Sequence, residues 1–83
     1  MNANEREQAY AVRSRADLVR FIRSLAEQNP NEWHNASLAS YLDALAAWTE
    51  DMDGYFKNMG EPIPEQPDWG LFAKMLTAAK YYS

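Results

Sequence analysis

The 83-residue chain contains no cysteine, and this absence excludes several kinds of site. Disulfides, thiolate catalysis and every cysteine-based zinc, haem or iron–sulfur site are ruled out, so a chain this small depends on packing or on partners for its stability. Histidine is almost absent too, since His34 is the only one. A single imidazole without cysteine does not make a typical structural zinc site. We expect His34 to be a loop or capping residue and expect no metal.

Glycine is also scarce, with only three in the chain. The glycine-rich phosphate loop, the dinucleotide fingerprint and the G-x-S-x-G nucleophile elbow each need glycines at fixed spacing, and none of these motifs occurs. We therefore expect no catalytic residues and no cofactor, and predict that the protein is not an enzyme. An enzyme would need a closed pocket holding a desolvated carboxyl group or His34.

Long apolar runs are missing as well. No run approaches the roughly 20 residues of a membrane span, and the first twenty residues lack the apolar segment of a signal peptide. These features predict no membrane association and a cytoplasmic location. The 47% hydrophobic and 13% aromatic content is nevertheless ample for the core of a single domain over residues 1–83.

Charge is distributed unevenly along a chain whose net charge is −4. Residues 1–23 carry five arginines against three carboxylates, whereas residues 24–73 carry nine carboxylates against Lys57 alone. An acidic middle opposes direct nucleic-acid binding, which depends on cationic neutralisation of phosphates. It suits a basic protein partner instead.

Helical periodicity appears in three segments, about 14–28, 36–58 and 68–82, and predicts an all-α fold, a small three-helix bundle with a long central helix. Ser14 and Asp17 form a capping-box pattern at the start of the first helix. Its apolar stripe is Leu18, Phe21, Ile22 and Leu25. Residues 1–12 fit either a flexible N-terminal arm or one or two helical turns.

The central helix has a wide apolar face, with Asn35 as its expected N-cap and Gly60 near its end. A seam spaced alternately by four and three consists of Leu38, Leu42, Leu45, Thr49, Met52, Phe56 and Met59. Beside it runs an aromatic column, Tyr41, Trp48 and Tyr55. The column fits either a core position or an exposed patch for a partner or a homodimer, since interfaces favour Tyr and Trp.

A proline-rich loop precedes the last helix, and we expect Ile63 to anchor that loop inward. Asp68 is the expected cap of the last helix. The residues expected to face the core from this helix are Trp69, Phe72, Met75, Leu76 and Ala79.

The stretch Glu50–Gly54 concentrates three carboxylates and a glycine, but its spacing fails the EF-hand calcium loop in both registers because the final glutamate is missing. The apolar seam also passes through it at Met52. We therefore interpret Glu50, Asp51 and Asp53 as a solvated helix face, with Asp53 paired to Lys57. Gly54 is predicted to mark a close helix contact or the start of fraying.

Three segments, "SRADLVRFIRSL", "EWHNASLASYLDALAAWTEDMDGYFKN" and "PDWGLFAKMLTAAKYY", resemble an uncharacterised family of bacterial domains of about 80 residues, over roughly residues 12–82. The residues that carry the resemblance are Trp33-x-Asn35-x-x-Leu38, Leu42, Trp48, Asp51, Tyr55, Trp69 and Tyr82. Family members have an acidic residue where this chain has His34. The resemblance implies a shared fold and a bacterial or phage origin, and no activity.

We expect a small acidic protein-interaction module, of the kind bacteria use as immunity proteins or phages use as inhibitors of host defences. The alternative is a structural homodimer or accessory subunit without an inhibitory role. The residues predicted to take part in protein interaction are Asp43, Glu50, Asp51, Asp53, Tyr41, Trp48 and Tyr55.

Overall fold

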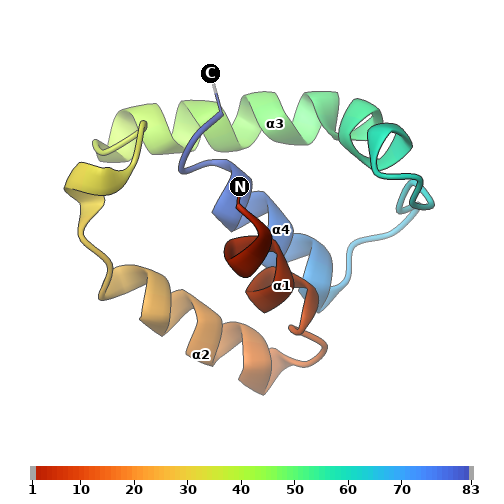
Figure 1. The fold of residues 1–83 in the computed structure, drawn as a ribbon, viewed down its shortest axis with the longest axis horizontal. Coiled ribbons are helices and arrows are strands. Elements are labelled where there is room, and N and C mark those ends of the chain that lie inside the picture. The colour runs from red at the N-terminus through yellow and green to blue at the C-terminus, as the bar shows by residue number, and fades with distance from the viewer. Residues whose placement is uncertain (1, 83) are drawn as a thin grey trace.

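The computed structural model describes residues 2–82 and is built from helices (Figure 1). The described residues form α1 (Ala3–Tyr10), α2 (Arg15–Ala26), a short 3₁₀ turn (Pro30–Glu32), α3 (Leu38–Asn58) and α4 (Trp69–Ala78). The all-α prediction is confirmed. The predicted count of three helices is wrong, because α1 forms from the segment that fitted either an arm or a helix; residue 1 of that segment lies outside the described residues. No helix among residues 2–82 is both long enough and apolar enough to cross a membrane.

The helix α4 is the hub of the fold, because α1, α2 and α3 each pack against it (Figure 1). Two groups of buried residues hold these contacts together. The first joins α1, α2 and α4 through Ala9, Val12, Phe21, Leu25 and Ala73. The second joins α3 and α4 through Trp48, Phe56, Leu71 and Ala78.

The helix α1 begins with a capping box, in which the Asn2 side chain accepts the Glu5 backbone N–H and the Glu5 carboxylate accepts the Asn2 N–H. This short polar helix approaches α4 closely because the residue that faces α4, Ala9, is small. Ala9 is fully buried. The backbone also comes close at Gly70, where an added Cβ would lie 3.0 Å from the Val12 carbonyl oxygen.

The helix α2 starts as predicted, with the Ser14 hydroxyl accepting the Asp17 N–H at 3.1 Å. The expected reciprocal bond does not form, since the Asp17 carboxylate accepts the Arg13 N–H instead. Phe21 and Leu25 are buried, but Ile22 is 45% exposed and its predicted core position is wrong. Among residues 2–82, α4 is the main helix that packs against α2, so one edge of its apolar stripe faces solvent.

The central helix α3 is capped by Ser37, whose hydroxyl accepts the Ser40 N–H at 3.1 Å, so the prediction of Asn35 as N-cap is wrong. At the other end Gly60 has φ +67°, and the N–H of Glu61 binds the carbonyl of Phe56 while that of Gly60 binds Lys57. These two bonds form a Schellman motif, which ends the helix where predicted.

The seam of α3 is only partly buried: Leu45, Thr49 and Met52 are half-buried, Phe56 is buried, and Met59 at its end is exposed. Phe56 is 1% exposed, whereas Leu38 and Leu42 are 75% and 50% exposed, so their predicted core positions are wrong. The reason is geometric, because α2 packs on α4 rather than on α3 and leaves the first turns of α3 uncovered. The prediction of Ile63 as an inward anchor is also wrong, since its side chain is exposed.

The last helix is capped by Asp68 as predicted, through a 2.7 Å bond from the Leu71 N–H. It ends at Ala78 rather than at residue 82, and the chain then turns back toward α3. Trp69 and Phe72 are exposed, contrary to prediction. Ala79 is fully buried, as predicted, and the other buried residues of this segment are Leu71, Ala73, Thr77, Ala78 and Lys80.

Candidate functional site

Four carboxylates form an acidic face along α3, and we use that name for Asp43, Glu50, Asp51 and Asp53. All four residues are exposed. Glu50 lies seven positions after Asp43, and Asp53 lies three positions after Glu50. This spacing places the three side chains on the helix surface directed away from α4. This arrangement agrees with the interpretation of the cluster as a solvated helix face.

Only one member of the acidic face has a side-chain partner in the described residues. The Tyr82 hydroxyl donates to Asp51 at 2.6 Å, and this bond, with a smaller contribution from burial, raises the pKa of the Tyr82 hydroxyl. The predicted ion pair between Asp53 and Lys57 does not form. The ion pairs found among residues 2–82 involve other residues. Three carboxylates therefore stay free to meet a partner.

Gly54 lies on the same outward surface, and both predictions made for it are wrong. It is exposed, α3 continues for another turn beyond it, and a Cβ added there would meet nothing within 4 Å. The glycine therefore marks neither a close contact nor the start of fraying.

The aromatic column lies against α4, as the core interpretation expects. Trp48 is 5% exposed and packs against Tyr55 with ring centroids 5.4 Å apart. Tyr41 donates to the Leu76 carbonyl at 2.7 Å, and burial raises its pKa to about 12. The column therefore offers little free surface to a second molecule.

A cleft of about 240 Å³ lies beside the column, between α3, α1 and the end of the chain. Its lining residues are Arg6, Trp48, Tyr55, Ala78, Tyr81 and Tyr82. This volume is below the roughly 300 to 1,000 Å³ of typical small-molecule sites. It does not provide the closed pocket that catalysis would need.

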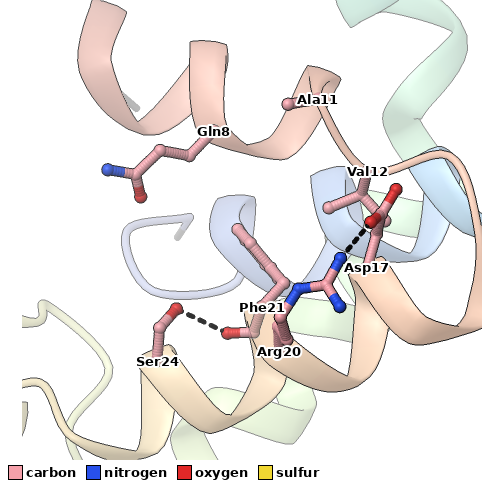
Figure 2. Close-up of a pocket in the computed structure, with 7 residues that line it drawn as sticks. All are labelled: Gln8, Ala11, Val12, Asp17, Arg20, Phe21 and Ser24. Atoms are coloured by element: carbon pink, nitrogen blue, oxygen red, sulfur yellow. Dashed lines mark hydrogen bonds and ion pairs between the residues drawn. The ribbon is translucent and has the colours of Figure 1, made fainter.

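A larger hollow of about 410 Å³ separates α1 from α2 (Figure 2). Three of its polar side chains are engaged: Arg20 pairs with Asp17, and the Ser24 hydroxyl donates to the Phe21 carbonyl at 2.7 Å. Bonds from the Arg13 N–H, the Ser14 hydroxyl and Arg20 lower the pKa of Asp17 despite an opposing effect of burial. The Gln8 amide lines the hollow as well and takes no part in these bonds (Figure 2).

Neither of these spaces brings acidic residues together as a ligand set. Among residues 2–82 no group of three or more His, Cys, Asp or Glu side chains is arranged to hold a metal ion. His34 is exposed and contacts Tyr81 edge-on at 5.4 Å between ring centroids.

The sequence analysis missed a buried charge at Lys80, which is 3% exposed. Its ammonium group donates to Glu5 at 2.6 Å and to the Gln28 side chain at 2.7 Å, and it lies 5.3 Å from the Trp33 ring and 5.2 Å from the Tyr81 ring. Burial opposes ionisation of Glu5, but the bond and charge of Lys80 outweigh it and lower the pKa of Glu5. The pair links α1 to the end of the chain.

A second polar contact was also missed. The Tyr10 hydroxyl donates to Glu61 at 2.7 Å and lies 2.9 Å from the Tyr55 hydroxyl, while Lys74 lies 4.1 Å from the centre of the Tyr10 ring. Burial, followed by the bonds to Tyr55 and Glu61, raises the pKa of Tyr10 strongly. This contact ties α1 to the loop after α3 and is structural in character.

Neither the curated proteins nor the solved structures contain a significant match to this chain. A family model, however, matches residues 14–83, from the N-cap of α2 onward, and leaves α1 outside the match. The chain belongs to the family of unknown function DUF7660.

Proposed function

We propose that this chain is a small non-enzymatic module that binds a basic surface of another protein through the acidic face of α3. The observation that carries the proposal is the exposure of Asp43, Glu50, Asp51 and Asp53 on one helix, where Lys57 is the one nearby cation in the sequence. Exposed like charges on one surface steer a partner of opposite charge and suppress wrong partners. Immunity proteins and inhibitors are the kind of protein in which such a surface would act.

The helix that carries the acidic face is well supported. Trp48 and Phe56 anchor it against α4, and Gly60 ends it in a Schellman motif. Such anchoring favours rigid docking, in which little conformational entropy is lost on binding. A preformed surface of this kind suits tight binding to one partner.

Solvation of the carboxylates supports binding rather than catalysis. An acid–base catalyst needs a carboxyl group desolvated enough to hold its proton near neutral pH. The members of the acidic face are exposed. The more buried carboxylate of Glu5 already forms an ion pair with the Lys80 ammonium group. These features favour an interaction role for the chain.

The experiment is affinity capture from lysate of the native cell, followed by binding measurements with the purified partner. We expect the double variant Asp43→Lys, Glu50→Lys to bind the partner at least tenfold more weakly than the wild type. The affinity of the wild type for the partner should fall strongly as the salt concentration rises. The matched control is Glu27→Lys combined with Glu32→Lys, which makes the same change in net charge at exposed positions outside α3. Equal binding by the two double variants would contradict the proposal.

A further inference from the structure

The molecule has an open apolar surface on the side opposite α1. On α4, Ala73 and Gly70 face α1, and Phe72 lies on the other side of the helix and is 42% exposed. On α2, Asp17, Arg20 and Ser24 line the hollow toward α1 (Figure 2), which leaves the opposite edge uncovered. We call this surface the open face; its exposed apolar residues are Val19, Ile22, Leu38, Leu42 and Phe72.

The α3 part of the open face lies on the flank of the helix away from Tyr82. Leu42 and Thr49 are seven positions apart on that flank. Thr49 lines a groove of about 250 Å³ that also contains Met52, Phe72 and Met75. The groove therefore connects the α3 flank at Thr49 to Phe72, with residues 64–67 of the loop before α4 forming another part of its lining. The helix α2 lies on the far side of α4 (Figure 1).

The open face is large enough to form a small interface. A monomer of 9.5 kDa is expected to expose about 5,000 Å². The chain exposes 5599 Å². The open face contributes on the order of 500 Å² of apolar side chain, which is near the upper end for the largest patch on a monomer. Two such faces with their polar rims reach the lower end of a standard interface, about 1,200 Å².

The charged residues at the edges of the open face point to a particular occupant. On α2, Arg15, Val19 and Ile22 form one stripe that ends at residue 26; on α3, a stripe runs from Leu42 to Asp53. The two end residues of each stripe are eleven positions apart, or about 16 Å along the helix. α2 and α3 run in opposite directions on either side of α4 (Figure 1), so Arg15 and Asp53 lie at the same end of the molecule.

Neither of these two charges is satisfied within the monomer. The ion pairs among residues 2–82 include neither Arg15 nor Asp53. Arg15 contacts the Trp69 ring only loosely, at 6.0 Å. A two-fold axis lying in the interface and running along α3 would place the α2 stripe of one copy over the α3 stripe of the other, with Arg15 opposite Asp53 twice. An axis at right angles would instead place each stripe over its own copy in reverse, so that Asp53 meets the uncharged Leu42 of the other copy and neither charge gains a partner.

We propose that the open face is a self-association surface whose occupant is a second copy of this chain, arranged with α2 over α3 of the partner. The interface is isologous, since the same patch serves both copies. This inference goes beyond the proposed function and uses a surface that shares only Asp53 with the acidic face, because Asp43 and Glu50 point away from the open face. The dimer leaves Asp43 and Glu50 of each copy exposed to other proteins.

The first test is sedimentation velocity of the purified chain over a concentration series reaching about 500 µM, which detects contacts with dissociation constants approaching 1 mM. We expect a shift from the 9.5 kDa monomer to a species of twice that mass. Leu42→Glu should raise the dissociation constant at least tenfold. Met59→Glu, which places the same charge at an exposed apolar residue beyond the stripe, should leave it unchanged.

The second test exchanges the charges. Arg15→Glu and Asp53→Arg should each weaken the dimer several-fold, and the double variant should restore it. The control combines Arg15→Glu with Asp43→Arg, which has the same net charge as the double variant but should restore nothing. Circular dichroism confirms that each variant folds.

Two results would overturn the inference. One is a monomer at every concentration in the series. The other is a dimer that Leu42→Glu leaves intact, which would assign self-association to another surface. Both measurements use the chain alone, so they do not bear on whether the acidic face binds a basic protein.

Discussion

At the residue scale, Gly54 occupies an exposed position inside α3 where the absence of a side chain has no structural use. Glycine in a helix interior costs about 0.5 to 1 kcal/mol relative to alanine, mainly through backbone entropy. We expect Gly54→Ala to raise the free energy of unfolding by about that amount. Urea denaturation followed by circular dichroism measures the change.

Gly60 is the matched control because its φ of +67° is a conformation that alanine adopts only with strain. Gly60→Ala should lower the free energy of unfolding by about 1 kcal/mol. If both substitutions changed stability in the same direction, the assignment of Gly54 to a regular solvent-facing turn would be wrong.

The ion pair of Glu5 with Lys80 gives the protein an acid-sensitive contact. The pKa of Glu5 in the folded protein lies below its ordinary value of 4.5, because Lys80 outweighs the effect of burial. The stability that this carboxylate contributes is therefore fully present above pH 4.5 and is lost as the pH falls through the lowered value.

We expect Glu5→Gln to destabilise the protein by about 1 to 3 kcal/mol at neutral pH, since the Lys80 charge stays buried with fewer partners. The difference between variant and wild type should shrink progressively below pH 4.5. Thermal denaturation at a series of pH values measures it, and a difference that stayed constant down to acid pH would contradict the assignment.

Residues whose role depends on near neighbours were predictable. Ser14 and Asp68 cap their helices as expected, because capping involves an amide three residues ahead. The burial of Lys80 depends on groups 52 and 75 positions away and was not predicted. A weak signal existed, since Lys80 follows Ala73 and Thr77 on one helical face.

At the element scale, Asn35 connects the loop before α3 to the end of α4. Its side chain donates to the carbonyls of Ala79 and Tyr82 at 3.0 and 2.7 Å, and its backbone N–H binds the Lys80 carbonyl. The residue therefore satisfies orphan carbonyls at a helix C-terminus instead of amides at an N-terminus.

We expect Asn35→Ala to destabilise the protein by about 2 kcal/mol, because part-buried carbonyls lose their donor. Asn35→Asp should cost at least as much, since a carboxylate near a helix C-terminus is unfavourable. An N-cap would tolerate Asp well. Equal stability of Asn35→Asp and wild type in urea denaturation would restore the original assignment, and Ser37→Ala, costing about 1 kcal/mol, serves as the reference for a true cap.

Three of the four helices were predictable from periodicity, while α1 was left open although Asn2 and Glu5 have capping-box spacing. The orientation of α4 was not predictable in the same way. Because three helices pack around it, its small residues face its neighbours and Phe72 remains outside. Apolar periodicity indicates which side of a helix is hydrophobic, but not how many neighbours are available to cover it.

At the scale of the whole molecule, α4 holds the other helices together, and damage to it should affect all of them at once. Leu71 is 6% exposed between α3 and α4. We expect Leu71→Ala to lower the free energy of unfolding by about 2 to 5 kcal/mol through cavity formation. Tryptophan fluorescence and far-ultraviolet circular dichroism should give the same transition midpoint.

If the two probes separated, α1 and α2 would be unfolding independently of α3. The exposed Phe72 supplies the control, because Phe72→Ala removes a larger side chain but should change stability by less than Leu71→Ala.

The acidic face was predictable because charge and helical spacing determine its exposure. The open face was not, because Leu38, Leu42 and Ile22 have the same pattern as core residues. Their exposure results from the packing of α2 on α4 rather than on α3. That choice of neighbour is a property of the whole chain.

Burial of the Lys80 ammonium also determines its chemical reactivity. The chain has three lysines, and Lys80 is the buried one, held by Glu5 and Gln28. Acylating reagents attack only neutral, solvent-accessible amines, so Lys57 and Lys74 should be modified first and Lys80 only when the fold opens. The rate at which an acylating reagent labels Lys80, followed by mass spectrometry, would therefore report opening of the fold without any change to the sequence.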